Sequence, residues 1–476
     1  MKPLLSLRAA LEDPHLLGPV MGGDSREPMR ALLLASQGEE LTASELSHFH
    51  RLTGRETSPT ERVEEALIIA GRRAGKSSGV AALAVYAAAL CDYSDRLQAG
   101  ERGVVLITAE NTKQARVILG YIAGVFDGNA ALRSLITNRT SSSLSLSNQI
   151  DVEVRACDFR SLRGLTLVMA IADEISFWRD DSGGSSNPDT EVIESIRPGL
   201  ATASGQLVAI TSPYSRRGYA FTTFSRHHGK DGDPRILVAK GATRDFNSTI
   251  PQSVIDRAYE RDPQVAASEW GGEFRSDLEQ FVRREVVIAC TVPNRFELPR
   301  AAGVRYAGFT DPSGGSADSF TLAIGHAEGD LVVIDALRER RPPFNPSDVV
   351  AEYADLLKSY GVSRIEGDNY AGQWPKEQFR KRGINYEPCG RPKSTLYLEL
   401  LPRLNGGRVE LLDHPRMAAQ LIALERRTSR SGKDSVDHPA GAGARDDIIN
   451  SVAGVVAMAG SPATAPTAFS MPFRWG

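Results

Sequence analysis

The segment Ala66–Val80, ALIIAGRRAGKSSGV, constrains this chain more than any other, because an apolar run gives way to a glycine-rich turn and then to small helix-forming residues. Strand, glycine loop and helix in that order form a P-loop, in which backbone N–H groups bind phosphate while a lysine and a hydroxyl reach the phosphates and Mg²⁺. Gly71, Gly75, Lys76 and Ser77 supply these groups. An alanine replaces the usual first glycine and two arginines occupy the loop, so the match alone is weak evidence for a nucleotide site.

The region around this loop has the pattern of a parallel sheet. Its apolar runs are Glu65–Ala70, Gly103–Ala109, Leu165–Asp173 and Gly205–Ser212, and helical stretches separate them. Near-continuous apolar strands of this kind are covered by helices on both faces of a sheet. We therefore predict an α/β fold with a parallel sheet for residues 41–250.

Two of these strands end in polar residues that suit ATP hydrolysis. Asp173 and Glu174 end one strand. An aspartate at this place holds the Mg²⁺ of P-loop enzymes, and the following glutamate is a natural base for polarising the attacking water. The alternative is that the pair only marks the solvated end of a strand. Thr211 and Ser212 end another strand and are placed to sense the γ-phosphate.

The loop arginines complete the first candidate site. Arg72 beside the γ-phosphate would neutralise charge that develops during phosphoryl transfer, as an arginine finger acting in cis does. For Arg72, and more so for Arg73, simple solvation at the surface is the alternative. The candidate nucleotide-binding residues are Gly71, Arg72, Arg73, Ala74, Gly75, Lys76, Ser77, Ser78, Asp173, Thr211 and Ser212, with Ser77 and Asp173 as metal ligands.

A different pattern of elements begins near residue 300. One strand ends at Asp311, a hairpin turns at Glu328–Asp330, a helix covers Pro346–Tyr360, and a later strand runs into Asp368. A hairpin followed by helix, strand and a final helix differs from the order in the first half. We predict a mixed sheet here.

Four aspartates of this second region form the second candidate site. Asp311 and Asp368 end strands, and Asp446 and Asp447 open the last helix. Acids at two neighbouring strand ends and on a packed helix can hold two Mg²⁺ or Mn²⁺ ions, which clamp the attacking and leaving oxygens of a phosphodiester. Taken singly, each could be a turn residue, a helix N-cap or a partner of the helix dipole. Adjacent helix residues point in different directions, so the inner ligand of the pair stays open.

Composition excludes several other classes of protein. The net charge of −3 gives no global basic signal for nucleic acid, so such a surface has to be local. The four cysteines form no CxxC pair, which argues against a zinc site or disulfide framework. The N-terminus does not read as a signal peptide, and the longest apolar run is too short to cross a bilayer. We expect a soluble, intracellular protein of two or three domains.

The whole set of motifs resembles the large subunit of tailed-bacteriophage terminases. The resemblance spans about 46–459 and rests on AGRRAGKSS, ITAENTKQAR, RGLTLVMAIADE, AITSPYSRRG, ASEWGGEF, FTDPSGG, IEGDNYAG and HPAGAGARDDIINSVAG. In that family the first P-loop glycine is usually missing and an arginine usually stands in the loop. Many relatives carry glutamate at the third strand, and Glu366 lies close to Asp368.

The resemblance implies an enzyme with two activities. A RecA-like (ASCE) ATPase domain would pull double-stranded DNA into a procapsid, and an RNase H-like nuclease domain would cut the concatemer. The implied cofactors are ATP with Mg²⁺, and two Mg²⁺ or Mn²⁺ ions for cutting. The implied partners are DNA, the terminase small subunit and the portal protein, with a homo-oligomeric ring when docked and possible monomers in solution, in the cytoplasm of the bacterial host and away from membranes.

The same resemblance assigns roles to residues and ranges. Arg72 and Glu174 would be catalytic in the ATPase, and the acids at 311, 368, 446 and 447 would be catalytic metal ligands in the nuclease. The expected divisions are an N-terminal segment at 1–40, the ATPase domain at 41–250, a helical linker subdomain at 251–299, the nuclease domain at 300–460 and a flexible tail at 461–476.

Two interpretations remain open within this scheme. Lys393 and Tyr397 lie where the family has a basic segment, and they either bind the phosphate backbone or belong to a solvated helix face. Asp335 also ends a strand, and we interpret it as structural. A chromosomal repair or transposition ATPase–nuclease, or a scaffold that binds nucleotide and DNA without chemistry, is the alternative to a terminase.

Overall fold

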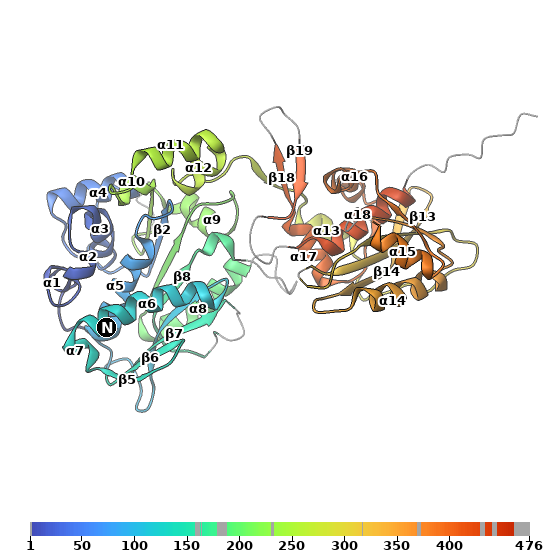
Figure 1. Ribbon diagram of the computed structural model, residues 1–476. Coiled ribbons are helices and arrows are strands. Elements are labelled where there is room, and N and C mark those ends of the chain that lie inside the picture. Colours follow the sequence, from blue (N-terminus) through green and yellow to red (C-terminus); the bar gives the residue numbers. More distant parts are fainter. Residues whose placement is uncertain are drawn as a thin grey trace, which may run out of the picture. The chain divides into compact units, whose positions relative to one another are not determined.

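The computed structural model describes residues 2–157, 162, 164–178, 188–229, 233–316, 318–368, 373–428, 434–439 and 445–460, so the predicted flexible tail at 461–476 lies outside the described residues. The chain divides into two compact units (Figure 1), with unit 1 ending at Leu278 and unit 2 beginning at Glu279. Within the described ranges, no helix is both long and apolar enough to span a bilayer.

Unit 1 is built on an eight-stranded, mostly parallel sheet. In sheet order its strands are β10 (Ile236–Gly241), β2 (Glu65–Ala70), β9 (Gln206–Thr211), β8 (Leu167–Asp173), β4 (Gly103–Ala109), β7 (Ile150–Ala156), β6 (Ser143–Leu146) and β5 (Ile136–Arg139). The strands from β10 to β7 run parallel, and β6 and β5 extend one edge antiparallel. The predicted parallel sheet is confirmed.

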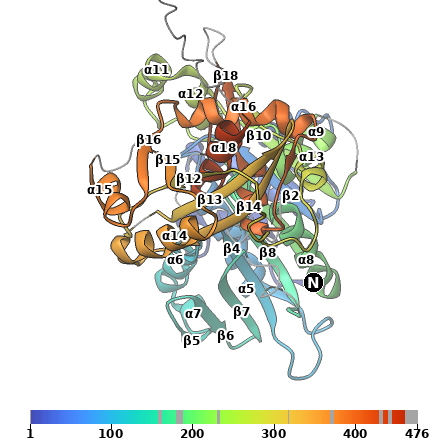
Figure 2. The ribbon, with the colours of Figure 1, turned by 90° about the vertical axis from the view of Figure 1, so that its right-hand side faces the viewer.

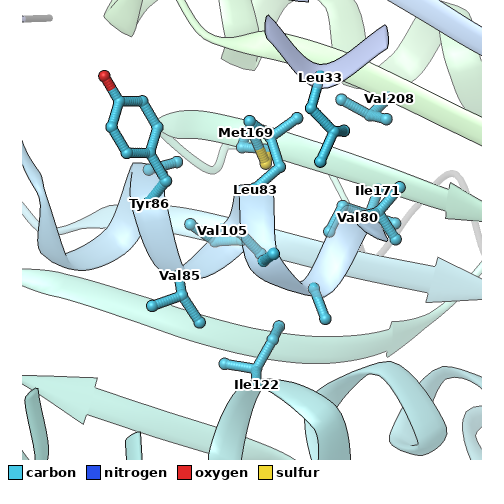
Figure 3. Packing of buried hydrophobic residues seen from close by; sticks show 14 of the residues in the cluster. Leu33, Val80, Leu83, Val85, Tyr86, Val105, Ile122, Met169, Ile171 and Val208 are labelled. Carbon is cyan, nitrogen blue, oxygen red and sulfur yellow. The ribbon is translucent and has the colours of Figure 1, made fainter. Parts of the chain in front are cut away.

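Both faces of the central part of this sheet are buried, which explains why the residues of β2, β4, β8 and β9 are buried and mostly apolar. Along β2, Ala66 and Ile68 pack into one core while Leu67 and Ile69 pack into another. The first core takes in α3 (Glu27–Ser36), α5 (Lys76–Ala89) and α6 (Thr112–Gly128), and the second takes in α8 (Pro188–Ala203) and α9 (Gly218–His227). Figure 3 shows side chains of α5 between strand residues and those of α3 and α6.

Shorter elements surround the sheet of unit 1. Helix α4 (Ala43–Thr53) begins with a capping box, in which Thr42 and Glu45 satisfy each other's backbone N–H groups. The remaining elements are β1 (Lys2–Pro3), α1 (Leu7–Glu12), α2 (Gly18–Met21), η1 (Asp24–Arg26), α4 (Ala43–Thr53), β3 (Cys91–Asp92), α7 (Ala130–Arg133), η2 (Ile175–Phe177), α10 (Thr243–Phe246), α11 (Gln252–Arg261) and α12 (Pro263–Glu269).

Unit 2 is built on a six-stranded mixed sheet, as predicted. Its order is β16 (Asn385–Pro388), β15 (Arg364–Gly367), β12 (Tyr306–Asp311), β13 (Phe320–Glu328), β14 (Leu331–Arg340) and β17 (Val409–Glu410). Strands β12, β13 and β14 are antiparallel, while β15 and β16 continue parallel to β12. The predicted hairpin turns at Gly329, whose φ of 64° favours glycine.

Helices cover both faces of the mixed sheet (Figure 2). On β13, Leu322 and Ile324 face a core shared with α14 (Pro346–Ser359) and α15 (Trp374–Lys381). Ala323 faces the other core, shared with α16 (Lys393–Asn405), α17 (Pro415–Ala423) and α18 (Asp447–Ala459). Helix α13 (Arg284–Cys290) and a small sheet of β11 (Leu278–Gln280), β18 (Glu425–Thr428) and β19 (Asp434–Asp437) complete the unit.

Two candidate catalytic sites

The order of the strands brings the first candidate site together. Strands β2, β9 and β8 are neighbours and parallel, so the loops at their carboxyl ends meet at one edge of the sheet. The P-loop follows β2, Ser212 follows β9, and Asp173 and Glu174 lie at the end of β8. Residues far apart in the sequence therefore face one another here.

Lys76 lies at the centre of this site. Its Nζ atom donates hydrogen bonds to Ala70 O (2.8 Å), Gly71 O (3.3 Å) and Ser212 Oγ (3.0 Å), and lies 3.8 Å from Glu174 Oε1. Only 7% of the residue is exposed. Burial lowers the pKa of the Lys76 ammonium, and the nearby carboxylates of Glu174 and Asp173 oppose that effect. An ammonium in this place can bind phosphate oxygens at the mouth of the loop.

Asp173 and Glu174, at the end of β8, lie in different environments. Burial, with the charge of Glu174, raises the pKa of Asp173 to about 7, although Lys76 opposes the shift. Glu174 adopts a left-handed backbone conformation with φ of 50°. Its Oε2 atom accepts a hydrogen bond of 2.9 Å from Ser212 N. The predicted base is thus bonded directly to the end of β9, the strand predicted to sense the γ-phosphate.

The P-loop is held by residues that the sequence analysis did not single out. Arg72 N donates to Glu269 O (2.5 Å), and the exposed guanidinium of Arg72 forms an ion pair with Glu269 Oε1 at 2.9 Å. Thr243 Oγ1 donates to Arg72 O (2.8 Å), and Asn247 Nδ2 donates to Arg73 O (2.9 Å). Arg72 therefore faces α12 in this structure. Glu269 stands in the motif ASEWGGEF, but neither that motif nor the sequence around Thr243 and Asn247 predicts a contact with the loop.

The N-terminal segment, to which the sequence assigned no chemistry, also reaches the loop. Arg26 NH1 donates to Ser78 Oγ at 3.0 Å. A Cβ atom at Gly75 would come within 2.5 Å of the same nitrogen, and Gly75 has a φ of 86°. The backbone conformation thus favours glycine here, and the Arg26 side chain comes close to it. Arg26 places a further cation beside the phosphate-binding loop.

The second candidate site lies at the carboxyl ends of β12 and β15. These strands are parallel neighbours in which Thr310 pairs with Gly367, so Asp311 and Asp368 follow side by side. The backbone N–H of Asp368 donates to Thr310 O at 3.2 Å, which fixes this register one residue further. Helix α18 packs against β12 and β13 and brings its first residues to the same edge.

The aspartates that open α18 are engaged in different ways. Asp446 occupies the N-cap position but makes no side-chain capping bond. Its Oδ2 atom instead accepts bonds from Tyr397 OH (2.8 Å) and Lys393 Nζ (2.8 Å). Asp447 Oδ2 accepts a bond from Ser319 N at 3.0 Å. The N-cap alternative therefore does not account for Asp446.

The carboxylates of this site repel one another. Burial raises the pKa of Asp311 well above its usual value of 3.8, and the charges of Asp447, Asp368 and Asp446 raise it further, against a hydrogen bond from Asn450. Burial likewise raises the pKa of Asp447 to about 6, with Asp446 adding to the shift and the Ser319 N–H opposing it. Such crowded acids favour either protons or cations.

The donor set fits hard divalent cations, because every candidate ligand is an oxygen. Asn450 adds a buried amide oxygen without a hydrogen-bond partner among the described residues. In this arrangement, however, no three His, Cys, Asp or Glu side chains of the described residues already surround a common metal position. The acids are therefore neighbours at one edge of the sheet, but their side chains do not converge on one point.

The sequence left the roles of Lys393 and Tyr397 open, and it wrongly placed Asp335 at the end of a strand, whereas Asp335 lies within β14. Tyr397 has no exposed surface, so it is neither a solvated residue nor a DNA contact in this structure. Lys393 pairs with Asp446 and, at 2.9 Å, with Asp437, and these carboxylates raise its pKa although burial opposes them. Asp335 is buried on β14, and its Oδ2 atom lies 2.7 Å from His326 Nδ1, which agrees with a structural role.

Of three comparisons with known proteins, only the one with solved structures finds matches to this chain. No family model matches the chain, and no curated protein matches it. The chain is 14% identical to the large terminase of bacteriophage HK97, with 91% of this chain and 99% of that chain covered and a TM-score of 0.39. It is 10% identical to the large terminase of a thermophilic bacteriophage in complex with ADP, with 90% and 98% covered and a TM-score of 0.41. For the large terminase nuclease of the thermophilic phage G20c with bound magnesium, the identity is 20%, the coverage 36% and 94%, and the TM-score 0.29. These three solved structures are of bacteriophage large terminases, the family whose motifs the sequence of this chain resembles.

Proposed function

We propose that this chain is the large subunit of a tailed-bacteriophage terminase. Unit 1 would be a RecA-like ATPase that drives double-stranded DNA into a procapsid, and unit 2 an RNase H-like nuclease that cuts concatemeric DNA. The observation that carries the proposal is the presence of two separate sites on one chain. A buried lysine lies near an Asp-Glu pair in unit 1, and in unit 2 the charges of Asp368, Asp446 and Asp447 act on the buried Asp311.

In the ATPase site each residue has a defined task. Lys76 and the loop N–H groups would bind the phosphates, and Ser77 and Asp173 would hold Mg²⁺, which offsets phosphate charge. Glu174 would accept a proton from the attacking water. Its hydrogen bond from Ser212 N couples its position to the end of β9. Arg72 would leave Glu269 to act on the γ-phosphate, since the ion pair now occupies its guanidinium.

In the nuclease site the chain supplies charge and position. Asp311, Asp368, Asp446 and Asp447 would hold two Mg²⁺ or Mn²⁺ ions, which supply activation of water and stabilisation of the leaving oxygen. Two of these acids are fixed by the β12–β15 register and two by α18. Lys393 and Tyr397 orient Asp446 through its Oδ2 atom.

The proposal includes the partners of a packaging motor. These are double-stranded DNA, the terminase small subunit, the portal protein and further copies of this chain in a docked ring, inside the bacterial host. A motor that moves along any sequence reads phosphates rather than bases, so local basic surface suffices despite the net charge of −3.

A separation-of-function experiment tests the proposal. Linear and supercoiled plasmid are incubated with the protein, ATP and Mg²⁺ or Mn²⁺, and phosphate release and cutting are scored separately. Lys76→Ala should abolish ATP turnover and leave Mn²⁺-dependent cutting, whereas Asp311→Asn or Asp368→Asn should do the reverse. Lys113→Ala and Asp355→Asn change exposed residues of the same types and serve as controls. Joint loss of both activities in a folded Lys76→Ala variant contradicts the division of labour.

A further inference from the structure

Asn450 lies among the acids of the second site although no motif singles it out. It belongs to α18, one turn after Asp446 and Asp447, so it lies on the same helix face as that pair. Its Nδ2 atom donates to Asp311 Oδ2 at 2.8 Å and lies 3.5 Å from Asp368 Oδ2. The amide therefore connects the helix with both strand ends that carry acids.

The other half of this amide is unsatisfied. Asn450 is 1% exposed, and its Oδ1 atom has no hydrogen-bond partner among the described residues. The backbone N–H of Asn450 already donates to Asp446 O within the helix, so the side chain does not serve the backbone. A buried polar atom normally finds a partner, and an orphaned one points to a missing water, ion or ligand.

We propose that Asn450 is a fifth member of the nuclease metal site, which rests on the proposed nuclease function of unit 2. Its Nδ2 group holds Asp311 and Asp368 together when no cation is present, by offsetting the repulsion between them. Its Oδ1 atom provides an uncharged oxygen for the cation or for a water bound to it, as amide carbonyls do for hard cations. Asn450 is thus a positioning residue that joins the metal site without adding negative charge.

Direct measurement of metal binding tests this role apart from catalysis. Full-length, nucleotide-free protein is titrated with Mn²⁺, and free Mn²⁺ is followed by electron paramagnetic resonance, with circular dichroism to confirm folding. Asn450→Ala should weaken Mn²⁺ binding at least tenfold. Asn450→Asp keeps an oxygen donor, so its Mn²⁺ affinity should equal or exceed that of the wild type, while its melting temperature without metal should fall. Asn405→Ala, at an exposed position of α16, is the matched control.

The outcomes separate this inference from the function on which it rests. Wild-type affinity for Mn²⁺ in a folded Asn450→Ala variant would overturn the role of Asn450, provided that Asp311→Asn loses Mn²⁺ binding. If the wild type itself takes up no Mn²⁺, or Asp311→Asn binds it normally, the metal site of unit 2 fails as a whole. Equal loss of affinity in Asn450→Ala and Asn450→Asp would also contradict the proposal, because it would make the N–H group the required feature.

Discussion

Burial lowers the pKa of the lysine and raises the pKa of aspartates in these two sites. It lowers the pKa of Lys76, whereas it raises the pKa of Asp173 to about 7 and that of Asp447 to about 6. In each case the charged form loses contact with water and gains too little from its neighbours. Both sites therefore hold groups whose charged forms call for a ligand of opposite sign.

At this scale the first prediction concerns pH and the stability of the protein without metal. An aspartate usually has a pKa of 3.8, and the pKa of Asp447 in the folded protein is about 6. Between about pH 4 and about pH 6, folding is therefore accompanied by uptake of a proton. The cost of the buried charge is absent below about pH 4, grows up to about pH 6 and is complete above it. Asp447→Asn should therefore raise the melting temperature at pH 7.5 and leave it nearly unchanged at pH 3.5.

The measurement for Asp447 is thermal unfolding in a chelating buffer at both pH values. Asp355→Asn, which alters an exposed acid of α14, should show no such pH dependence. A rise in melting temperature of equal size at both pH values would mean that the charge of Asp447 is not the cause.

A second prediction at the residue scale concerns Arg72. If its guanidinium acts on charge that develops in the transition state, Arg72→Ala should lower ATP turnover by about 10³-fold or more with little change in nucleotide affinity. Steady-state hydrolysis and ADP titration measure the two quantities, with the exposed Arg116→Ala on α6 as control. An affinity that falls in step with turnover would make Arg72 only a binding residue.

The residues of the sites differ in how far their sequence context reveals them. Asp173 and Asp311 end largely apolar strands, and Asp368 directly follows the short strand β15, so their positions at strand ends were predictable from the sequence. Arg26 and Glu269 reach the P-loop only through folding; Glu269 stands in the motif ASEWGGEF, but that motif does not tell that its glutamate pairs with Arg72. Asn450 lies between: its helical spacing from the Asp446 and Asp447 pair was visible, but an asparagine carries no charge that marks it as a ligand.

At the scale of elements, helix α18 determines whether the second site forms. A Cβ atom at Gly454 would collide with the ring of Phe309 on β12, two residues before Asp311. The absence of a side chain therefore lets the helix approach the strand closely enough for its acids to join those of the sheet. Phe309 is buried, so it has little room to move away.

The third prediction follows from this contact. Gly454→Ala should lower the stability of unit 2 by about 1–3 kcal/mol, because an added methyl group overfills a packed core. Cutting should fall sharply, since α18 is pushed away from Asp311, while ATP turnover stays near normal. Chemical denaturation and the two activity assays measure these effects.

Gly120→Ala on α6 is the control for this substitution. Nothing lies within 4 Å of a Cβ atom there, so alanine should stabilise the helix by up to about 1 kcal/mol. Normal cutting by Gly454→Ala would show that the helix tolerates the displacement.

The elements themselves were predictable where burial is two-sided. The runs at β2 and β4 match the observed strands residue for residue, because an uninterrupted apolar strand needs cover on both faces. Strands β5, β6 and β7 were not predicted. Strands β6 and β7 alternate between buried and partly exposed residues, and β5 is largely exposed, so their sequence signal is weak.

At the scale of the whole molecule, each unit has its own pair of hydrophobic cores. The cores of unit 1 lie on the two faces of its sheet, and those of unit 2 lie on the two faces of the mixed sheet. Domains with separate cores can unfold in separate transitions, and a ligand stabilises only the domain that binds it.

The fourth prediction uses these cores. Calorimetry should show two transitions. ADP in excess over Mg²⁺ should raise the temperature of one transition, and Lys76→Ala should abolish that rise. Mn²⁺ alone should raise the temperature of the other transition, and Asp311→Asn should abolish that rise. At a hundredfold excess over the dissociation constant, each ligand should add about 2.7 kcal/mol. A single transition that responds to both ligands would contradict independent units.

The way the P-loop is held has a consequence for how the protein folds. Its contacts with Arg26, Thr243 and Asn247 span 52, 171 and 174 residues of chain. Contacts between residues so far apart form slowly, because long loops must close before they repay the lost chain entropy. During synthesis from the N-terminus, β2 and α5 can form well before Thr243 and Asn247 have emerged. We therefore expect nucleotide-binding competence to appear late, only after the chain has been made as far as α12.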